Sequence, residues 1–360
     1  MAILAALAVI SCVGAPKAGA KLTGDADSKL VWGYDSNVLE SIRAQRRAAD
    51  SFVRLEASFN LRGDVGRWGQ PQASLRWAGE CYRLYREENR NLLQGMLTWR
   101  WGDRLRWTRF AWNYGLTAYP AASQRDVVRH AASVQRSVPL WRNIRLQASA
   151  GGICVRSRAG EGGTRVEGPS ARHAWQLGAD LRRSIGGRWQ VLAGADWGQI
   201  KYDRAVVKEP IAGEMRFSED NQRDRSLLCV ARLSRKGLPL LSLSYGYRTI
   251  WSNSFGFSLQ RHELGLLASC MLPRRFSLQL IGRLEDTRYE EPGYIIFLPA
   301  EETEDPDLGA RNGLTLQLRR PLGEGWSGEV RASWHRNEAL VLRRFYEKTR
   351  LMVAIRYSLD

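Results

Sequence analysis

Residues Tyr346–Ser358 read YEKTRLMVAIRYS and alternate in character with a period of two. The apolar side chains occupy every second position: Leu351, Val353, Ile355 and Tyr357, followed by Leu359. Arg350 and Arg356 fall on the opposite face. Because successive side chains of a β-strand point to opposite faces, this stretch predicts a strand with one apolar and one cationic face.

The same alternation recurs along most of the chain. One clear example pairs an apolar series with a polar one: Val53, Leu55, Ala57, Phe59 and Leu61 against Arg54, Glu56, Ser58, Asn60 and Arg62. Counting such segments from Lys29–Val38 onward gives sixteen strands. Short turns rich in Gly, Pro or Asp, such as 102–104, alternate with longer polar loops, such as 203–221 and 290–310.

This alternation of connections favours one architecture. An even number of strands, with short turns at one end and long loops at the other, is typical of outer-membrane barrels. No apolar run beyond the N-terminus reaches the roughly 20 residues of a membrane-spanning helix. The absence of predicted helices between the strands argues against an α/β fold. The sequence therefore predicts an all-β fold, a transmembrane antiparallel up-and-down β-barrel of about 16 strands.

The N-terminus has the pattern of an export signal. Residues 2–10 form an apolar core, and Ala18-Gly19-Ala20 is a small-x-small cleavage motif, so we expect residues 1–20 to be a signal peptide. The stretch 9–12 (VISC) loosely resembles a lipoprotein box, but the apolar run before it is short, which favours ordinary cleavage. We expect residues 21–28 to be a short periplasmic segment and 29–360 to be the barrel.

Several of the 14 tryptophans follow the short turns: Trp68, Trp107, Trp141, Trp189 and Trp326. A ring of indoles at headgroup depth forms an aromatic girdle in membrane barrels. The alternative is that they are core residues of a soluble β-sandwich or propeller. That alternative does not explain the alternation of long and short connections.

The cysteines and histidines do not form a pattern typical of a metal site or a catalytic site. The cysteines that remain after cleavage share the apolar faces, and no two have metal-ligand spacing: Cys81, Cys154, Cys229 and Cys270. Ser333 and His335 lie two residues apart on the inward face of their strand, near its outer end, and form a candidate Ser/His pair. A single histidine at the rim of a barrel is, however, more often a solvated residue than a catalytic base. We therefore expect no catalytic residues, no metal and no cofactor.

Charge is the strongest functional feature. The formal net charge is +17, and arginine supplies most of the 54 basic residues. If the apolar faces contact lipid, ten arginines line the pore: Arg54, Arg62, Arg76, Arg100, Arg145, Arg232, Arg248, Arg283, Arg331 and Arg350. Such a lumen would favour anions. Alternatively, these arginines form cross-strand salt bridges with acids of the same face, and the two interpretations are compatible.

Two features of the long loop 290–310 stand out. An apolar run is a candidate constriction loop, or else a hairpin that extends a strand past the membrane: Tyr294, Ile295, Ile296, Phe297 and Leu298. The acidic run that follows could hold a divalent ion at the lipopolysaccharide surface, but solvation is the more common state of such runs: Glu301, Glu302, Glu304, Asp305 and Asp307.

Both ends of the predicted barrel carry a family resemblance. Gly33–Val38 (GYDSNV) resembles the first strand, and Tyr346–Leu359 the last strand, of bacterial outer-membrane β-barrels, among them putative β-barrel porins and export-associated barrels. The closing strand of that family usually ends in an aromatic residue read by the barrel assembly machinery, whereas this chain ends in Leu359-Asp360.

The resemblance implies a place in the cell and a function. It implies an outer-membrane channel in contact with lipid, lipopolysaccharide and the barrel assembly machinery, either a porin-like pore or the outer-membrane part of an export system. We expect a small or polymeric, anionic solute, a homo-oligomer as one assembly state, and no nucleic-acid partner, because the arginines are spread along strands. The alternatives are an outer-membrane enzyme with a rim active site and a structural or assembly barrel without an open pore.

Overall fold

The computed structural model describes residues 21–38, 49–66, 69–103, 105–121, 123, 126–157, 172–211, 214–290, 312–339 and 344–359. Sixteen strands run through these ranges: β1 (Lys21–Asp35), β2 (Asp50–Asp64), β3 (Gln70–Tyr82), β4 (Arg90–Gly102), β5 (Trp107–Ala118), β6 (Val127–Trp141), β7 (Ile144–Ser157), β8 (Arg172–Ile185), β9 (Trp189–Ile211), β10 (Glu214–Arg235), β11 (Leu240–Ser252), β12 (Leu259–Leu272), β13 (Phe276–Tyr289), β14 (Asn312–Gly323), β15 (Trp326–Ala339) and β16 (Arg344–Leu359). Two 3₁₀ turns, η3 (Arg86–Glu88) and η6 (Pro273–Arg275), lie between strands.

Every strand pairs with its neighbours in the sequence, and β16 returns to β1, so the sheet closes into a barrel. The prediction of a sixteen-stranded antiparallel barrel closed by the last strand is confirmed. In the closing pair Lys29 stands opposite Arg356, and Asp35 stands opposite Arg350. Closure gives both β1 and β16 a hydrogen-bonded neighbour on each side, so the described sheet has no terminal strand.

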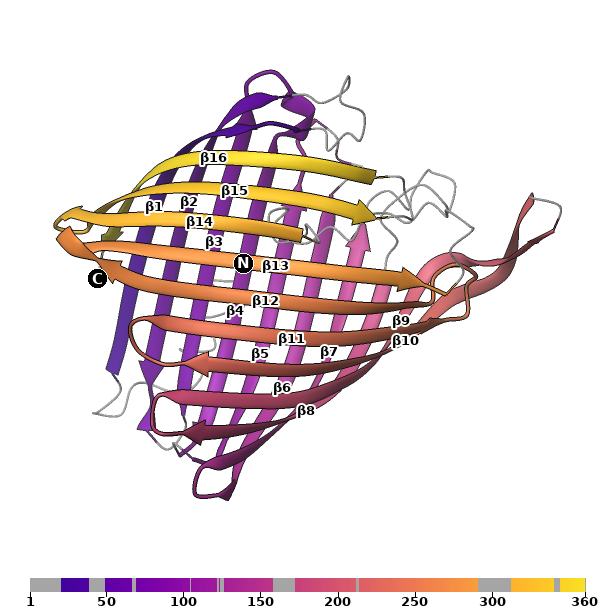
Figure 1. The fold of residues 1–360 in the computed structure, drawn as a ribbon, viewed down its shortest axis with the longest axis horizontal. Helices are drawn as coiled ribbons and strands as arrows, with labels where there is room; N and C mark the ends of the chain where they lie inside the picture. Colours follow the sequence, from indigo (N-terminus) through magenta and orange to yellow (C-terminus); the bar gives the residue numbers. More distant parts are fainter. Residues whose placement is uncertain are drawn as a thin grey trace.

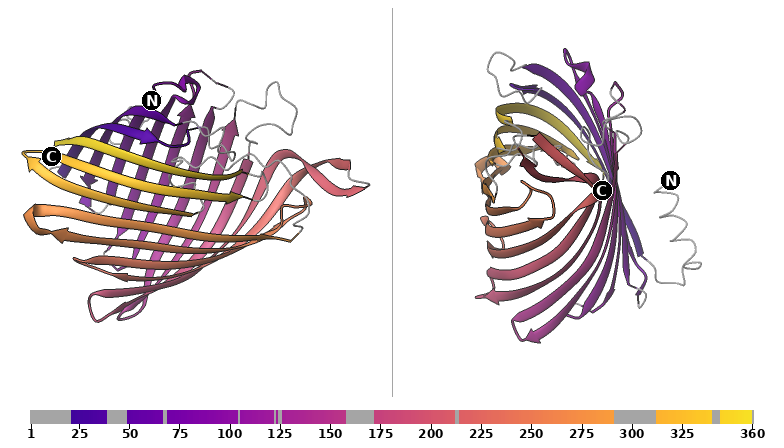
Figure 2. Two further views of the ribbon diagram at one scale, coloured as in Figure 1. Left: turned by 45° about the horizontal axis from the view of Figure 1, so that its top comes forward. Right: turned by 90° about the vertical axis from the view of Figure 1, so that its right-hand side faces the viewer.

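The barrel is flattened, with its two walls crossing. Figure 1 shows β1–β7 behind, crossed at a steep angle by β11–β16 in front, and the right-hand view of Figure 2 shows the curved front wall against a flatter back wall. Strand tilt produces this crossing, because strands on opposite walls of a tilted barrel lean in opposite directions. The short connections gather at one end, which we name the turn end, and the longer ones at the other, the loop end.

Side-chain direction follows the predicted alternation. On β16 the apolar series points outward, with Leu351 52 % and Val353 53 % exposed. Its other face points inward, where Arg350 is fully buried and Met352 is 9 % exposed. The cysteines within the described ranges are free, and Cys81 and Cys229 are exposed among the outward apolar residues.

The first strand is longer than predicted. It begins at Lys21 rather than Lys29, and residues 21–28 pair with β2 as far as Asp64, so they belong to the sheet instead of preceding it. The outward residues of this segment, Leu22, Gly24 and Ala26, are mostly small. The apolar stripe is therefore too weak to mark the strand in the sequence.

The polar stretch 203–221, predicted to be a loop, is a hairpin. Strands β9 and β10 continue through most of it and project past the rim, at the right of Figure 1. The register shifts between Phe217 and Asn221 and again before Arg223, and these irregularities break the two-residue period by which strands are recognised. Val207 and Phe257, both buried, pack together at the base of the hairpin.

The short turns contain the residues that tight reversals require. Gly102 has φ of 104°, where a side chain would collide with the Arg106 carbonyl at 2.2 Å. Asp103 accepts hydrogen bonds from the Arg106 and Leu105 backbone N–H groups, and these bonds lower the pKa of its carboxyl group.

Some predicted segments lie outside the described residues: the signal peptide 1–20, the candidate constriction Tyr294–Leu298 and the acidic run that follows it. Within the described ranges, no helix is long and apolar enough to cross a membrane.

Candidate functional site

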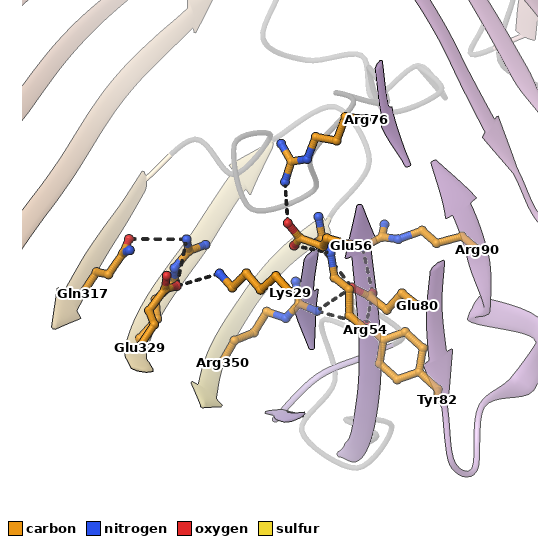
Figure 3. A network of polar contacts seen from close by, with 11 residues as sticks. Lys29, Arg54, Glu56, Arg76, Glu80, Tyr82, Arg90, Gln317, Glu329 and Arg350 are labelled. Atoms are coloured by element: carbon orange, nitrogen blue, oxygen red, sulfur yellow. Dashed lines mark hydrogen bonds and ion pairs between the residues drawn. The ribbon is translucent and has the colours of Figure 1, made fainter. Parts of the chain in front are cut away.

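Charged side chains crowd the inner face beside the closing seam. The carboxylate of Glu80, only 2 % exposed, lies 2.9 Å from the Arg90 guanidinium, 3.6 Å from that of Arg54 and 3.4 Å from that of Arg350. The Tyr82 hydroxyl donates a 2.9 Å hydrogen bond to the same carboxylate. Figure 3 shows these groups converging from β2, β3, β4 and β16. A single carboxylate therefore holds guanidinium groups from three other strands.

Arg350 is the most completely enclosed member of this cluster, with no exposed surface. Its Nε lies 3.3 Å from the Asp35 carboxylate, which also lies 3.0 Å from the Lys348 ammonium. The guanidinium stacks over the Phe52 ring, 4.5 Å from the ring centroid. A guanidinium can stay charged without water only because these groups replace its hydration.

A second set of ion pairs lies nearer the turn end. Lys29 is 2.8 Å and Arg331 3.5 Å from the Glu329 carboxylate, and Arg76 is 3.0 Å from that of Glu56. The Lys29–Glu329 pair joins β1 to β15 and the Arg76–Glu56 pair joins β3 to β2, as Figure 3 shows, whereas Arg331 and Glu329 both belong to β15. Cross-strand ion pairs of the kind expected from the sequence thus occupy this part of the inner face.

Three large cavities lie along the inner face in the part of the chain that the structure describes. The first, of about 600 Å³, is lined by β1–β6 and β14–β16. The second, of about 770 Å³, lies between β1–β3 and the opposite wall, β10–β16. The third, of about 520 Å³, lies at the turn end beside Arg62 and Arg100. Lys29, Arg76 and Arg331 line both larger cavities, so the second set of ion pairs separates them.

The outer face has the opposite chemistry. Large apolar side chains more than a third exposed cover it around the barrel: Leu55, Trp77, Leu177, Leu243, Leu264, Leu316, Val330 and Val353. Aromatic rings meet near both ends of the strands, with Trp197 5.9 Å from Trp251 at the loop end and Trp326 4.8 Å from Tyr357 at the turn end. A closed sheet with apolar groups outside and charges inside suits lipid, not water.

The protein is a transmembrane β-barrel of the outer-membrane type.

Comparison with known proteins adds only distant likenesses. No family model matches the chain, and no curated protein matches it. Among solved structures, an anion-selective porin from Comamonas acidovorans is 11 % identical with a TM-score of 0.48, over 94 % of this chain and 100 % of that one. OprB from Pseudomonas putida is 10 % identical with a TM-score of 0.46, over 95 % and 94 %. A bacterial polysaccharide outer-membrane secretin is 8 % identical with a TM-score of 0.46, over 93 % and 98 %. The assignment of the fold rests on the closed strand order and the apolar outer face.

The ten predicted pore-lining arginines are distributed over this barrel in three ways. Seven of them line one of the cavities: Arg54, Arg62, Arg76, Arg100, Arg232, Arg283 and Arg331. Arg145 and Arg248 are half-buried in the wall. Arg350 lies in the buried cluster and contacts no cavity that we observe among the described residues.

Sequence reasoning missed several members of these two sets of ion pairs. Asp35, Lys29 and Arg90 were not singled out, although each points inward by the parity of its strand. Extending the alternation Lys29, Val31, Asp35 along β1 would have found the acid that pairs with Arg350. The partners of each charge depend on strand order, which the pattern of a single strand does not contain.

The candidate Ser/His pair lies on the inner face of β15. Ser333 is 3 % and His335 4 % exposed, and His335 contributes to the lining of the second cavity. His335 therefore lies in the wall and not at a solvated rim. In the described part of the chain, no group of three or more His, Cys, Asp or Glu residues could hold a metal ion.

Proposed function

We propose that this barrel is a passive outer-membrane channel, not an enzyme, and that its lumen favours anionic solutes. The observation that carries the proposal is the charge of the two larger cavities. Each is lined by six Lys or Arg side chains and three Asp or Glu side chains. The acids neutralise half of the cations, and a fixed positive surplus remains where a solute would pass.

A surplus of fixed positive charge would act by changing the local concentrations of ions in the lumen. Fixed positive charge beside a low-dielectric wall raises the local concentration of anions and lowers that of cations. The ion pairs Arg76–Glu56 and Lys29–Glu329 tie these side chains to neighbouring strands of the wall, so that their charges are fixed in space. A polymeric anion moved by an export system would meet the same field as a small one.

The test is conductance of the purified protein in a planar lipid bilayer with a KCl gradient. We expect stepwise channel openings and a zero-current potential whose sign is that of chloride diffusion. The surplus should weaken as salt rises, because screening at about 1 M KCl confines the field to roughly 3 Å. A silent bilayer would contradict the channel, and a potential of the opposite sign would contradict the anion preference.

A further inference from the structure

Basic side chains gather on the outer face of the barrel, at the loop end of four adjacent strands, β7–β10. Each is exposed, and each shares the parity of the outward apolar residues of its strand, as Arg225 does with Cys229 and Lys201 with Trp197. This parity places them outside the lumen and away from the proposed path of solutes. We call them the basic band: Arg156, His173, Lys201, Arg223 and Arg225.

The strand registers bring the members of the basic band side by side. Lys201 on β9 stands directly opposite His173 on β8 and Arg223 on β10. Arg225 is the diagonal neighbour of Lys201 across the same pair of strands, and Arg156 on β7 is the diagonal neighbour of His173. Like charges that face each other directly on a sheet are destabilising. The row formed by Lys201 and Arg223 therefore carries a repulsion that a bound anion would remove.

The charge of the basic band has no partner within the described ranges. None of its five side chains makes an ion pair or a hydrogen bond to a described residue. One acid, Asp203, lies two residues beyond Lys201 on β9, and it forms no ion pair with a described residue either. Glu219 and Asp220 lie beyond the register shifts, further along the hairpin. The Lys and Arg members of the band are thus a surplus of exposed positive charge.

Outward tryptophans fix the depth of the basic band relative to lipid. Trp251 on β11 stands opposite Arg225, and Trp175 on β8 lies in the same row, to which Gln199 on β9 connects it. Exposed tryptophan rings on a membrane barrel lie at headgroup depth. Lys201 lies two residues, about 7 Å along β9, beyond this row. The band therefore lies at the level of lipid headgroups, and the longer connections place this end of the barrel on the extracellular side.

We propose that the basic band binds the phosphate groups of lipopolysaccharide, the phosphorylated glycolipid of the outer leaflet. Phosphate oxygens accept two parallel hydrogen bonds from an arginine such as Arg223, and a lysine such as Lys201 adds a point charge. The acyl chains lie against the apolar outer face, on the membrane side of Trp175 and Trp251. An acidic protein would approach from water, whereas the band begins in the row of these two tryptophans. Because the band lies outside the lumen, the proposal requires no open channel.

Native mass spectrometry of the full chain, folded in detergent and titrated with bisphosphorylated lipid A, tests the proposal. EDTA is present, so that divalent ions cannot bridge the lipid to acids of the protein. We expect saturable binding of the lipid, and at least about ten-fold weaker binding of fully dephosphorylated lipid A, which keeps the acyl chains but loses the charge-assisted hydrogen bonds. Inorganic phosphate at the same concentration should not displace the lipid, because it lacks the chains that the outer face contacts.

Variants locate the site. Lys201→Gln combined with Arg223→Gln removes two charges of the band and should weaken lipid A binding at least about ten-fold. Arg183→Gln combined with Lys236→Gln removes one arginine and one lysine that are exposed at the turn end, so this matched control should bind as the parent does. Lys201→Arg keeps the charge and should also bind as the parent does. Heat-dependent mobility on gels confirms that each variant is folded.

Four results would overturn the proposal: no saturable binding of lipid A, equal binding of its dephosphorylated form, displacement by an equal concentration of inorganic phosphate, or equal weakening by the turn-end control. The second result would mean that the acyl chains alone are recognised, and the third that the band is a site for free phosphate. None of these measurements requires conductance. A barrel that conducts anions but does not bind lipid A keeps the channel and loses the lipid site, and a silent barrel that binds it does the reverse.

Discussion

The guanidinium of Arg350 on β16 lies 3.4 Å from the carboxylate of Glu80 on β3, although 270 positions separate them and β1 and β2 lie between their strands. The contact crosses the seam where the two ends of the sheet meet. Together with Asp35, it ties the last strand to the first three through side chains as well as backbone hydrogen bonds. Ion pairs of Arg350 with Glu80 and Asp35 therefore hold the closing strand in place on the inner face, and we call them the ionic lock.

Removing Arg350 should destabilise the barrel strongly. Arg350→Met leaves the buried carboxylates of Asp35 and Glu80 with fewer partners, and breaking a buried pair from one side costs about 3–5 kcal/mol. Urea unfolding in lipid vesicles, followed by tryptophan fluorescence, measures this loss.

Two companion variants make that result specific. Arg62→Met removes an arginine that is 64 % exposed and 3.8 Å from Asp25, so it should change stability by less than about 0.5 kcal/mol. Adding Glu80→Gln to Arg350→Met should deepen the loss, because the buried guanidinium groups of Arg90 and Arg54 then lose the carboxylate that they share. Equal losses in Arg62→Met and Arg350→Met would argue against the lock.

A charge on the outer face should block folding into lipid. Val353 is 53 % exposed and points outward near the middle of β16, so Val353→Arg should cost about 2–4 kcal/mol. Gln317→Arg places the same side chain on the inner face, beside the first cavity, and should fold as the parent does. Folding yield into vesicles, read from heat-dependent mobility on gels, distinguishes the two. A normal yield for Val353→Arg would mean that this face does not contact acyl chains.

Cysteine labelling gives a chemical readout of the same assignment. Cys229 is exposed on the outer face of β10, opposite Ala195 and Tyr247, and lipid should cover it. In vesicles we expect Cys229 to resist a membrane-impermeant sulfonated maleimide, and to react once the protein is unfolded in detergent. Ser244→Cys, on the inner face of β11, should react in the folded state. Fast labelling of Cys229 in vesicles would speak against the outward assignment.

Reversing a cavity charge should shift ion selectivity. Arg76 lines both larger cavities, so Arg76→Glu replaces one positive charge by a negative one along the proposed path. The zero-current potential in a KCl gradient should move toward cation preference, more at low salt than at high salt. Arg188→Glu alters an exposed arginine in the turn between β8 and β9 and provides the control. An identical shift in both variants would indicate a general surface effect instead of a lumen effect.

The strands and their faces were predictable because a half-buried strand repeats its chemistry every two residues. Leu351 and Val353 could be assigned outward, and Arg350 inward, from their spacing alone. Prediction was wrong where that period weakens. The start of β1 was not recognised because its outward residues are mostly small, so the apolar stripe is weak. The extension of β9 and β10 was not recognised because register shifts interrupt the two-residue period. In both places the backbone hydrogen bonds, not the side-chain pattern, define the strand.

The sequence by itself determined the sixteen alternating strands, their order, and the charged inner face, because these depend on local periodicity and on the lengths of the connections. The tertiary structure decided which charges meet. Arg350 and Glu80 touch because closure places β16 three strands from β3. Contacts across a seam or a lumen depend on curvature and register, and no window of the chain encodes either one.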